Sequence, residues 1–466
     1  MDLDIDTNIY SSNSNLEIEI EEFQKTELTG CGLSELMYGV VEGFYGTPWS
    51  TFQRQKLFYT MNKQNLNTYI YAPKDDEKHR KNWRIFYDQT ECNNILNLIE
   101  SARAQHINFV YVISPGLDIV YSSQSDREIL KQKIEQVIAL GASGVGLFLD
   151  DIEPELLEQD AILYESFSHA HVDITNYIYD AVGRPKIFVF CPTEYCSSRA
   201  KPSLGTSNYL HRLGECLHEN IIIMWTGPRV VSRAIPRDHI KEVCKVLKRK
   251  PLIWDNLHAN DYDKHQIFLG PFSNRPLSLF PHIKGFVLNP NCQYELNFIP
   301  ILSFSFWVEA AHKKYSIERI GGNSGRFREI SFQNTSEYIP EKVFVDCCKM
   351  WVKEFITVSR EEFLFEPPLT INSSQPLLTS NAMKFSVDYD DSDDSSDSLN
   401  NEYNFEVNIN HFDVYHVANF NYLPGQLGKF SKSFLAEFCW IKSSSTNFWQ
   451  SKIVIVFLQP RTLTLN

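Results

Sequence analysis

The sequence predicts an α/β fold, a (β/α)8 barrel of TIM type, followed by a partial, mostly helical C-terminal region. Short apolar segments of β type recur about every 30 to 43 residues from Tyr38 onward, and helical stretches separate them. The segments are apolar on both faces, as buried parallel strands are. Eight such strands close into a barrel that leaves no unpaired edge. The expected strands are 38–41, 68–72, 108–113, 144–149, 187–191, 221–225, 252–255 and 285–288.

The helices between these strands are predicted from their start and stop signals. Ser50 and Gln53 have the spacing of a capping box, in which each side chain satisfies a backbone amide of the other residue. A second helix is expected from a cap at Ser125 to a stop at Gly141, and a third over about 163–182. The buried stripe expected on the first of these helices consists of Phe52, Leu57 and Met61.

Changes in composition divide the rest of the chain. A dense run of Asp and Ser cannot bury enough apolar surface to become ordered, which predicts a disordered insert. Apolar residues at helical spacing predict helices over 341–355 and 412–442. The expected regions are a disordered acidic tail (1–35), the catalytic β/α barrel (36–305), a helical extension (306–372), the disordered acidic insert (373–405) and a partial helical stalk with a divergent C-terminus (406–466).

Composition and charge narrow the classes of function. Of the 466 residues 43% are hydrophobic, which is enough apolar surface for a large core. The net charge of −14 argues against binding nucleic acid by neutralising phosphates, and no apolar run is long enough for a membrane span. The acidic start lacks the basic and apolar parts of a secretory signal. The ten cysteines lack zinc spacing, so we expect reduced thiols and a cytoplasmic and nuclear location.

Asp150 and Asp151 stand where a buried strand opens into a loop. Side chains alternate along a strand, so both carboxylates face one pocket only if the backbone turns there. Two close carboxylates do not easily ionise together, and glycoside hydrolysis uses one charged and one protonated acid. The alternatives are a capping Asp after a strand and a magnesium site.

Other residues at the strand ends have the chemistry that sugar binding requires, although the pattern alone does not fix a substrate. Lys74 is suited to bond a sugar hydroxyl, or else it pairs with the acids beside it. Cys191 ends a strand without an assigned base, so we interpret it as pocket lining. The histidines show no HExxH pattern, so no metal centre is expected. The candidates for stacking or hydroxyl recognition, each more often structural when taken alone, are Tyr195, Trp254, Asn256, Asp261 and Asn289.

Six ordered motifs resemble glycoside hydrolase family 84, and its animal members above all, over roughly residues 38–300. They are 39–49, 69–76, 150–151, 191–196, 254–263 and 289–292. The resemblance implies retaining hydrolysis of β-O-linked N-acetylglucosamine (O-GlcNAc) from Ser and Thr of nuclear and cytoplasmic proteins. The 2-acetamido oxygen of the sugar attacks the anomeric carbon, and water then opens the resulting oxazoline. The expected partners are therefore O-GlcNAc-modified proteins, without nucleic acid, membrane, metal or cofactor.

The resemblance also implies a role for each matching residue. Asp150 matches the residue that holds the acetamido N–H group. Asp151 matches the acid that protonates the departing oxygen and later deprotonates water. The other implied roles are binding of sugar hydroxyls by Gly43, Lys74, Asp261 and Asn289, orientation near the reacting centre by Tyr195 and Asn256, lining of the acetamido pocket by Cys191 and Trp254, and a rim contact by Val230.

Parts of the sequence depart from the family. Arg199 stands where an aromatic residue that lines the peptide cleft is expected, so peptide contacts are expected to differ. Segments 420–424 and 438–441 resemble the first helices of the family's dimer-forming stalk, but residues from about 443 do not. We therefore expect an incomplete stalk and no acetyltransferase-like C-terminal domain, which leaves a homodimer open. The rival functions are another hexosaminidase of the family, hyaluronidase-like, and an inactive glycan-binding or scaffold protein.

Overall fold

The computed structural model describes residues 36–262, 266–315, 337–358, 411–426, 428–429 and 431–433. The tail expected at 1–35 and the acidic insert expected at 373–405 lie outside these residues. Among the helices that the structure describes, none is long and apolar enough to cross a membrane.

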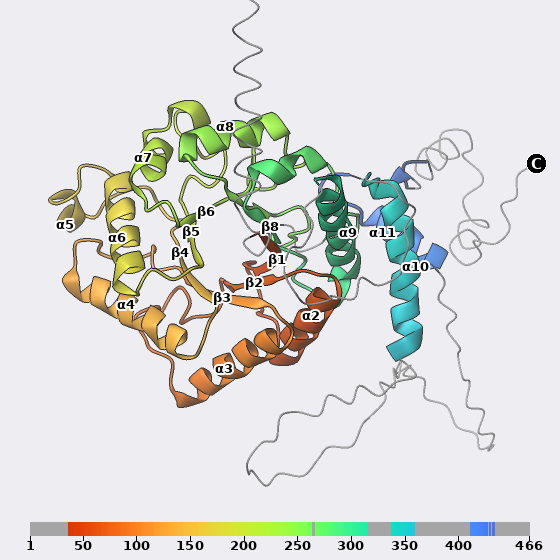
Figure 1. Cartoon of the computed structure of the whole chain (residues 1–466), viewed down its shortest axis with the longest axis horizontal. Helices are drawn as coiled ribbons and strands as arrows, with labels where there is room; N and C mark the ends of the chain where they lie inside the picture. The colour runs from red at the N-terminus through yellow and green to blue at the C-terminus, as the bar shows by residue number, and fades with distance from the viewer. Residues whose placement is uncertain are drawn as a thin grey trace, which may run out of the picture.

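Eight parallel strands form a closed barrel in the described part of the chain, and β8 completes it by pairing with β1 (Figure 1). The predicted (β/α)8 fold is therefore confirmed. The strands are β1 (Met37–Glu42), β2 (Thr68–Tyr71), β3 (Asn108–Ile113), β4 (Gly144–Phe148), β5 (Phe188–Cys191), β6 (Ile222–Trp225), β7 (Leu252–Asp255) and β8 (Gly285–Leu288).

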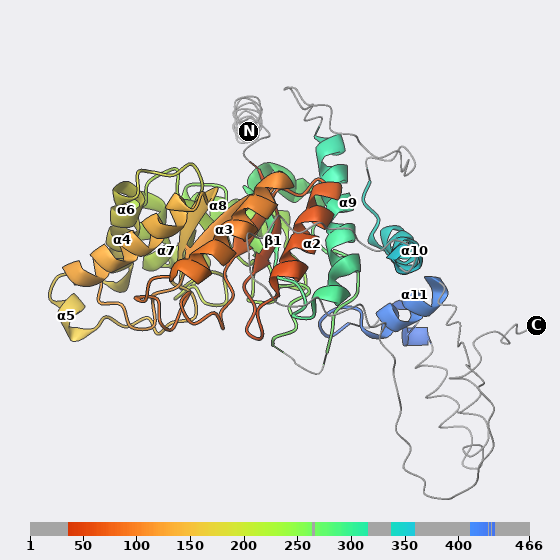
Figure 2. The ribbon, with the colours of Figure 1, turned by 90° about the horizontal axis from the view of Figure 1, so that it is seen from below.

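Helices surround the strands on the outside of the barrel (Figures 1 and 2). They are α2 (Thr51–Lys63), α3 (Gln89–Ala104), α4 (Gln124–Ala139), α5 (Glu158–Ala161), α6 (Phe167–Ala181), α7 (Asn208–Cys216), α8 (Arg237–Leu247) and α9 (Phe298–Lys314). Three short 3-10 helices accompany them: η2 (Leu204–Thr206), η3 (Leu277–His282) and η4 (Tyr294–Asn297).

The strands are apolar on both faces because each separates two hydrophobic clusters. Val40 of β1 packs outward, in the cluster between strands and helices, whereas its neighbour Val41 packs inside the barrel. In the same way Leu147 of β4 packs outward, whereas its neighbour Phe148 packs inside the barrel. This alternation explains why the strands read as continuous apolar segments.

The start of α2 is as predicted, but its buried face is not. The hydroxyl of Ser50 accepts from the backbone N–H of Gln53, and the Gln53 side chain accepts from the N–H of Ser50, so the capping box is confirmed. Leu57 and Met61 are buried, whereas Phe52 is 61% exposed. Including Phe52 in the stripe was wrong, because it precedes Leu57 by five residues and so lies about 140° around the helix from it.

Two helices start at other residues than the sequence suggested, and each has a serine as its N-cap. The N-cap of α4 is Ser123 rather than Ser125, and its hydroxyl accepts from the N–H of Asp126. Helix α6 starts after Ser166, which accepts from the N–H of His169, rather than at residue 163. Both serines use the side-chain-to-N3 bond that favours Ser at this position.

Helices α10 (Pro340–Val358) and α11 (His411–Phe420) lie at one side of the barrel, with α10 packed between α9 and α11 (Figure 2). The helix expected over 412–442 ends at Phe420 in the structure, because the chain turns at Pro424 and Gly425 (φ +63°). Residues 434–442 lie outside the described part. The barrel boundary expected at 305 falls inside α9.

Candidate active site

Asp150 and Asp151 follow β4 and line one pocket at the carboxyl ends of the strands. Asp151 has a φ of +50°, in the left-handed region that Asp adopts more readily than most residues. This is the backbone turn that neighbouring carboxylates need to face the same space. The next helix, α5, has Leu157 as its N-cap, so capping is not the role of either acid.

Asp150 is buried and forms an ion pair with Lys74, which follows β2. The Nζ of Lys74 donates to Oδ2 of Asp150 over 2.7 Å, and the two side chains are 1% and 6% exposed. The ammonium also lies 5.6 Å from the ring centroid of Phe148 and 5.8 Å from that of Trp254. Lys74 therefore pairs with Asp150 and not with the acids next to it in sequence.

Asp151 is more open and is surrounded by donors. Its Oδ1 accepts from the hydroxyl of Tyr195 at 2.8 Å and from Nη2 of Arg199 at 3.0 Å. Its Oδ2 accepts from the hydroxyl of Tyr45 at 3.3 Å, and Arg80 donates to that hydroxyl at 2.9 Å. Burial, followed by the charge of Asp151, raises the pKa of Tyr195 well above its ordinary value. The Tyr195 hydroxyl therefore keeps its proton and remains a donor.

Three side-chain oxygens of the pocket are buried and have no hydrogen-bond partner among the described residues. They are Oδ1 of Asp150, Oδ1 of Asp261 and Oδ1 of Asn289, and we call them the three unpartnered oxygens. Leaving a buried acceptor without a donor is unfavourable, so groups of this kind in a pocket indicate a ligand that brings donors. The pocket therefore suits a molecule that carries several O–H or N–H groups.

Asp261 and Asn289 are held so that these oxygens stay in place. The second oxygen of Asp261 accepts from the backbone N–H of Tyr45 at 2.9 Å, and burial raises the pKa of its carboxyl. The amide nitrogen of Asn289 donates to Oδ1 of Asn256 at 2.9 Å. Each residue thus uses one polar atom for fixation and leaves the other to the pocket.

Asn256 connects several parts of the site. Its Oδ1 also accepts from the indole N–H of Trp254 at 2.8 Å, and its Nδ2 donates to the carbonyl oxygen of Val230 at 2.8 Å. These bonds fix the plane of the indole ring that lines the pocket. Val230 contacts the site through its backbone carbonyl, and its side chain packs against the cluster inside the barrel.

Gly43 and Cys191 complete the wall. A Cβ at position 43 would lie 2.4 Å from the indole of Trp254, so the glycine makes room for that ring. Cys191 ends β5, and burial, with a further contribution from the charge of Asp150, raises the pKa of its thiol well above the ordinary value. A thiol that stays protonated lines the pocket and does not act as a nucleophile.

Three further residues line the pocket, and the sequence had not assigned them a role although they lie in the motifs or directly after a strand. Two of them lie within the motifs at 39–49 and 254–263, and one directly follows β6. They are Tyr45, Tyr262 and Thr226.

Buried polar contacts hold the strand ends that carry these residues. Asp255 ends β7 next to Asn256 and forms a bidentate ion pair with Arg275, at 2.7 Å and 2.8 Å, with both side chains almost fully buried. The hydroxyl of Thr193 donates to the carbonyl oxygen of Leu149 at 2.5 Å, which ties the loop after β5 to the residue before Asp150. These contacts fix the positions of the strand ends that carry the site.

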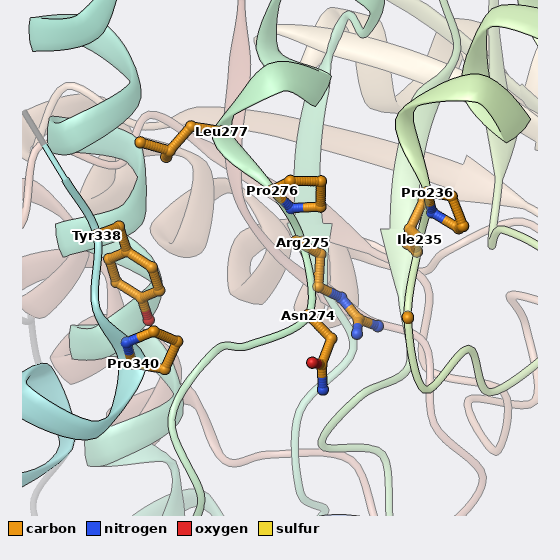
Figure 3. Close-up of a pocket in the computed structure, with 9 residues that line it drawn as sticks. Ile235, Pro236, Asn274, Arg275, Pro276, Leu277, Tyr338 and Pro340 are labelled. Carbon is orange, nitrogen blue, oxygen red and sulfur yellow. The ribbon is translucent and has the colours of Figure 1, made fainter.

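A second cavity lies outside the barrel, between the start of α8 and residues 337–340 (Figure 3). Arg275 reaches into this region, but its guanidinium donates to Asp255 and to three backbone carbonyl oxygens. None of the unpartnered buried polar atoms found in the described residues lines this cavity. In the same part of the chain, no group of three or more His, Cys, Asp or Glu side chains is placed to hold a metal ion. The reactive groups gather in the carboxylate pocket instead.

A β/α barrel with paired carboxylates at the carboxyl ends of its strands is the architecture of a barrel glycoside hydrolase. The chain belongs to the beta-N-acetylglucosaminidase family, whose sequence pattern matches residues 38–329. The relationship expected from the motifs is thereby confirmed.

Relatives and solved structures agree with this family. Protein O-GlcNAcase of the rat and that of the mouse are each 47% identical to the chain over 279 residues, which is 60% of this chain and 30% of the relative. The chain thus matches less than a third of the length of these curated relatives. The structure of a mutant of Thermobaculum terrenum O-GlcNAc hydrolase has a TM-score of 0.60 and 31% identity, covering 68% of this chain and 64% of that one.

Proposed function

We propose that the protein hydrolyses β-linked N-acetylglucosamine from Ser and Thr of O-GlcNAc-modified proteins, with retention and through an oxazoline intermediate. The carboxylate pair carries the proposal: Asp150 offers a buried, unpartnered oxygen to the pocket, and Asp151 beside it is held by hydroxyl and guanidinium donors. Similarity to proteins named O-GlcNAcase supports the choice of substrate. The proposed reaction uses no metal or cofactor.

Asp150 acts on the acetamido group of the sugar. Its Oδ1 accepts the acetamido N–H, which turns the acetamido oxygen toward the anomeric carbon. Positive charge develops on the acetamido group as that oxygen attacks, and an adjacent carboxylate stabilises the charge. Lys74 holds the other carboxylate oxygen in place and compensates the buried charge before the substrate binds.

Asp151 acts on the leaving oxygen. The bond between that oxygen and the anomeric carbon breaks, Asp151 gives the oxygen its proton, and the acetamido oxygen forms the new bond. In the second step Asp151 takes a proton from water, whose oxygen attacks the anomeric carbon and opens the oxazoline. Two successive inversions give net retention. The hydroxyls of Tyr195 and Tyr45 orient the carboxylate throughout.

The remaining pocket residues bind the sugar. Asp261 and Asn289 accept from its hydroxyls through their unpartnered oxygens. Trp254 and Cys191 supply the apolar wall against which the acetamido methyl group packs.

The acid role of Asp151 is tested with aryl N-acetylglucosaminides whose leaving groups differ in acidity. For Asp151→Asn we expect kcat to fall by about 10²–10⁴-fold with poorly acidic leaving groups. The fall should be far smaller with strongly acidic ones, which depart without protonation. An equal loss across the whole series contradicts the assignment.

The rival functions give different results in simple assays. Turnover of hyaluronan in preference to a glycopeptide would favour the hyaluronidase-like reading, whereas sugar binding without any turnover would favour a glycan-binding protein. The nuclear and cytoplasmic location that the proposed substrate implies is checked by imaging of the full chain. Light scattering of the purified protein decides whether a homodimer forms.

A further inference from the structure

Arg199 is a charged residue at the site whose hydrogen-bonding capacity is mostly unused. It follows β5 in a turn fixed by the bond from its own N–H to the carbonyl oxygen of Cys196, at 3.0 Å. Its Nη2 donates to Oδ1 of Asp151 at 3.0 Å, and the guanidinium lies 4.7 Å from the ring centroid of Tyr195. The Nε and Nη1 groups have no hydrogen-bond partner within the described ranges.

The position of this guanidinium fits ligand binding better than fold stability. The Arg199 side chain is 40% exposed and that of Asp151 is 26% exposed, and ion pairs open to solvent contribute little to stability. Stacking on Tyr195 orients the planar guanidinium without using its N–H groups. Asp151 therefore binds Nη2 of the guanidinium, while its Nε and Nη1 groups remain available to a ligand.

Arg80 lies on the other side of the same carboxylate. Its Nη2 donates to the backbone carbonyl oxygen of Asp151 at 3.2 Å, and its Nη1 donates to the Tyr45 hydroxyl. Two cationic side chains thus flank Asp151, in a chain whose net charge is −14. Two guanidinium groups therefore lie beside the proton-donating acid although the protein as a whole is acidic.

We propose that Arg199 determines substrate specificity by binding an acidic group of the peptide close to the glycosylated Ser or Thr. The proposal rests on the proposed function, in which Asp151 protonates the oxygen that joins sugar to peptide. Since Arg199 contacts Asp151 itself, residues next to the glycosylation site pass within reach of its Nε and Nη1. A guanidinium binds carboxylate or phosphate through two parallel N–H···O bonds.

The test compares glycopeptides that differ only in the residues flanking the glycosylated Ser, which are Glu, Gln, Lys or phosphoserine. We expect the Glu peptide to exceed the Lys peptide in kcat/KM by about fivefold at low ionic strength, which corresponds to about 1 kcal/mol. Added salt should reduce the ratio. A larger effect for phosphoserine than for Glu would identify phosphate as the preferred anion, and the reverse order would identify carboxylate.

Variants separate the charge of Arg199 from its structural effect. Arg199→Gln should bring the Glu-to-Lys ratio close to one, and Arg199→Lys should retain a preference for Glu. Arg184→Gln is the matched control, because it makes the same change of charge at an exposed ion pair after α6, on the opposite face of the barrel. That control should keep the parental ratio.

The proposal fails if the parent shows no preference for acidic peptides, or if Arg199→Gln keeps the full parental ratio. Turnover of an aryl N-acetylglucosaminide, which has no peptide, tests the proposed function separately. Dissociation constants of the same glycopeptides give the Glu-to-Lys ratio without any turnover. An inactive chain would thus count against the hydrolase function, while the binding ratio still decides the role of Arg199.

Discussion

The ion pair between Lys74 and Asp150 should be the most strongly coupled interaction in the pocket. Two unit charges 2.7 Å apart attract by about 6 kcal/mol at an effective dielectric constant of about 20. Most of that attraction offsets the loss of water around two nearly inaccessible side chains. Removing one partner leaves the other charge buried and uncompensated, which typically costs about 3–5 kcal/mol. We therefore expect Lys74→Met to lower the free energy of unfolding by about 3 kcal/mol or more.

A double-mutant cycle measures this coupling. Urea unfolding is followed by tryptophan fluorescence for the parent, Lys74→Met, Asp150→Asn and the variant with both changes. The double variant should be more stable than the sum of the single losses predicts, by about 2 kcal/mol or more, because it leaves no unpaired charge.

The exposed pair of Arg184 and Asp180 gives the matched control for this cycle. Its side chains are 64% and 44% exposed, and the same cycle there should give a coupling of about 0.5 kcal/mol or less. If the losses at Lys74 and Asp150 simply add, the two charges do not compensate each other and the reasoning is refuted.

Three further predictions concern the pocket wall and its supports. Gly43→Ala should reduce kcat/KM by about a hundredfold, because the added Cβ displaces the indole of Trp254. The control is Gly205→Ala, whose Cβ would contact only a flexible glutamate oxygen, and it should leave kcat/KM unchanged. Arg275→Lys should lower the free energy of unfolding by about 3 kcal/mol, because lysine cannot form the bidentate pair, and a loss under 1 kcal/mol would contradict this. Burial lowers the pKa of His171 to about 3 from an ordinary value of 6.5, so folding excludes its proton, and stability should fall as pH drops from about 6.5 toward 3. The slope of the free energy of unfolding against pH, measured by urea unfolding, should decrease by about 1.4 kcal/mol per pH unit in His171→Gln. An unchanged slope would show that His171 does not titrate as described.

The fold could be predicted from the sequence because its signals are local. β3, β7 and β8 have the predicted bounds, β1 is longer by one residue at each end, and the other strands differ by one residue at one end, since apolar runs between polar or glycine residues leave little freedom. The start of α4 shows where local signals fail. Ser123 and Ser125 are both suitable caps, and the choice depends on Asp126, which Arg84 binds at 2.7 Å from a distant loop. A contact that spans 42 residues cannot be recognised from the serines themselves.

The division of roles between the two acids shows the same limit. Asp150 and Asp151 share one stretch of sequence, and alternation along a strand already required the turn that the φ of Asp151 supplies. Their surroundings come from elsewhere: Lys74 reaches Asp150 across 76 residues, and Arg199 reaches Asp151 across 48. Closure of the barrel brings these cations to different carboxylates, one sealed and one open to solvent. A change at Lys74 should therefore affect stability and turnover of every substrate, whereas a change at Arg199 should alter the ranking of peptides. If variants of Lys74 and of Arg199 changed stability and peptide ranking to the same extent, burial would not separate the functions of these two residues.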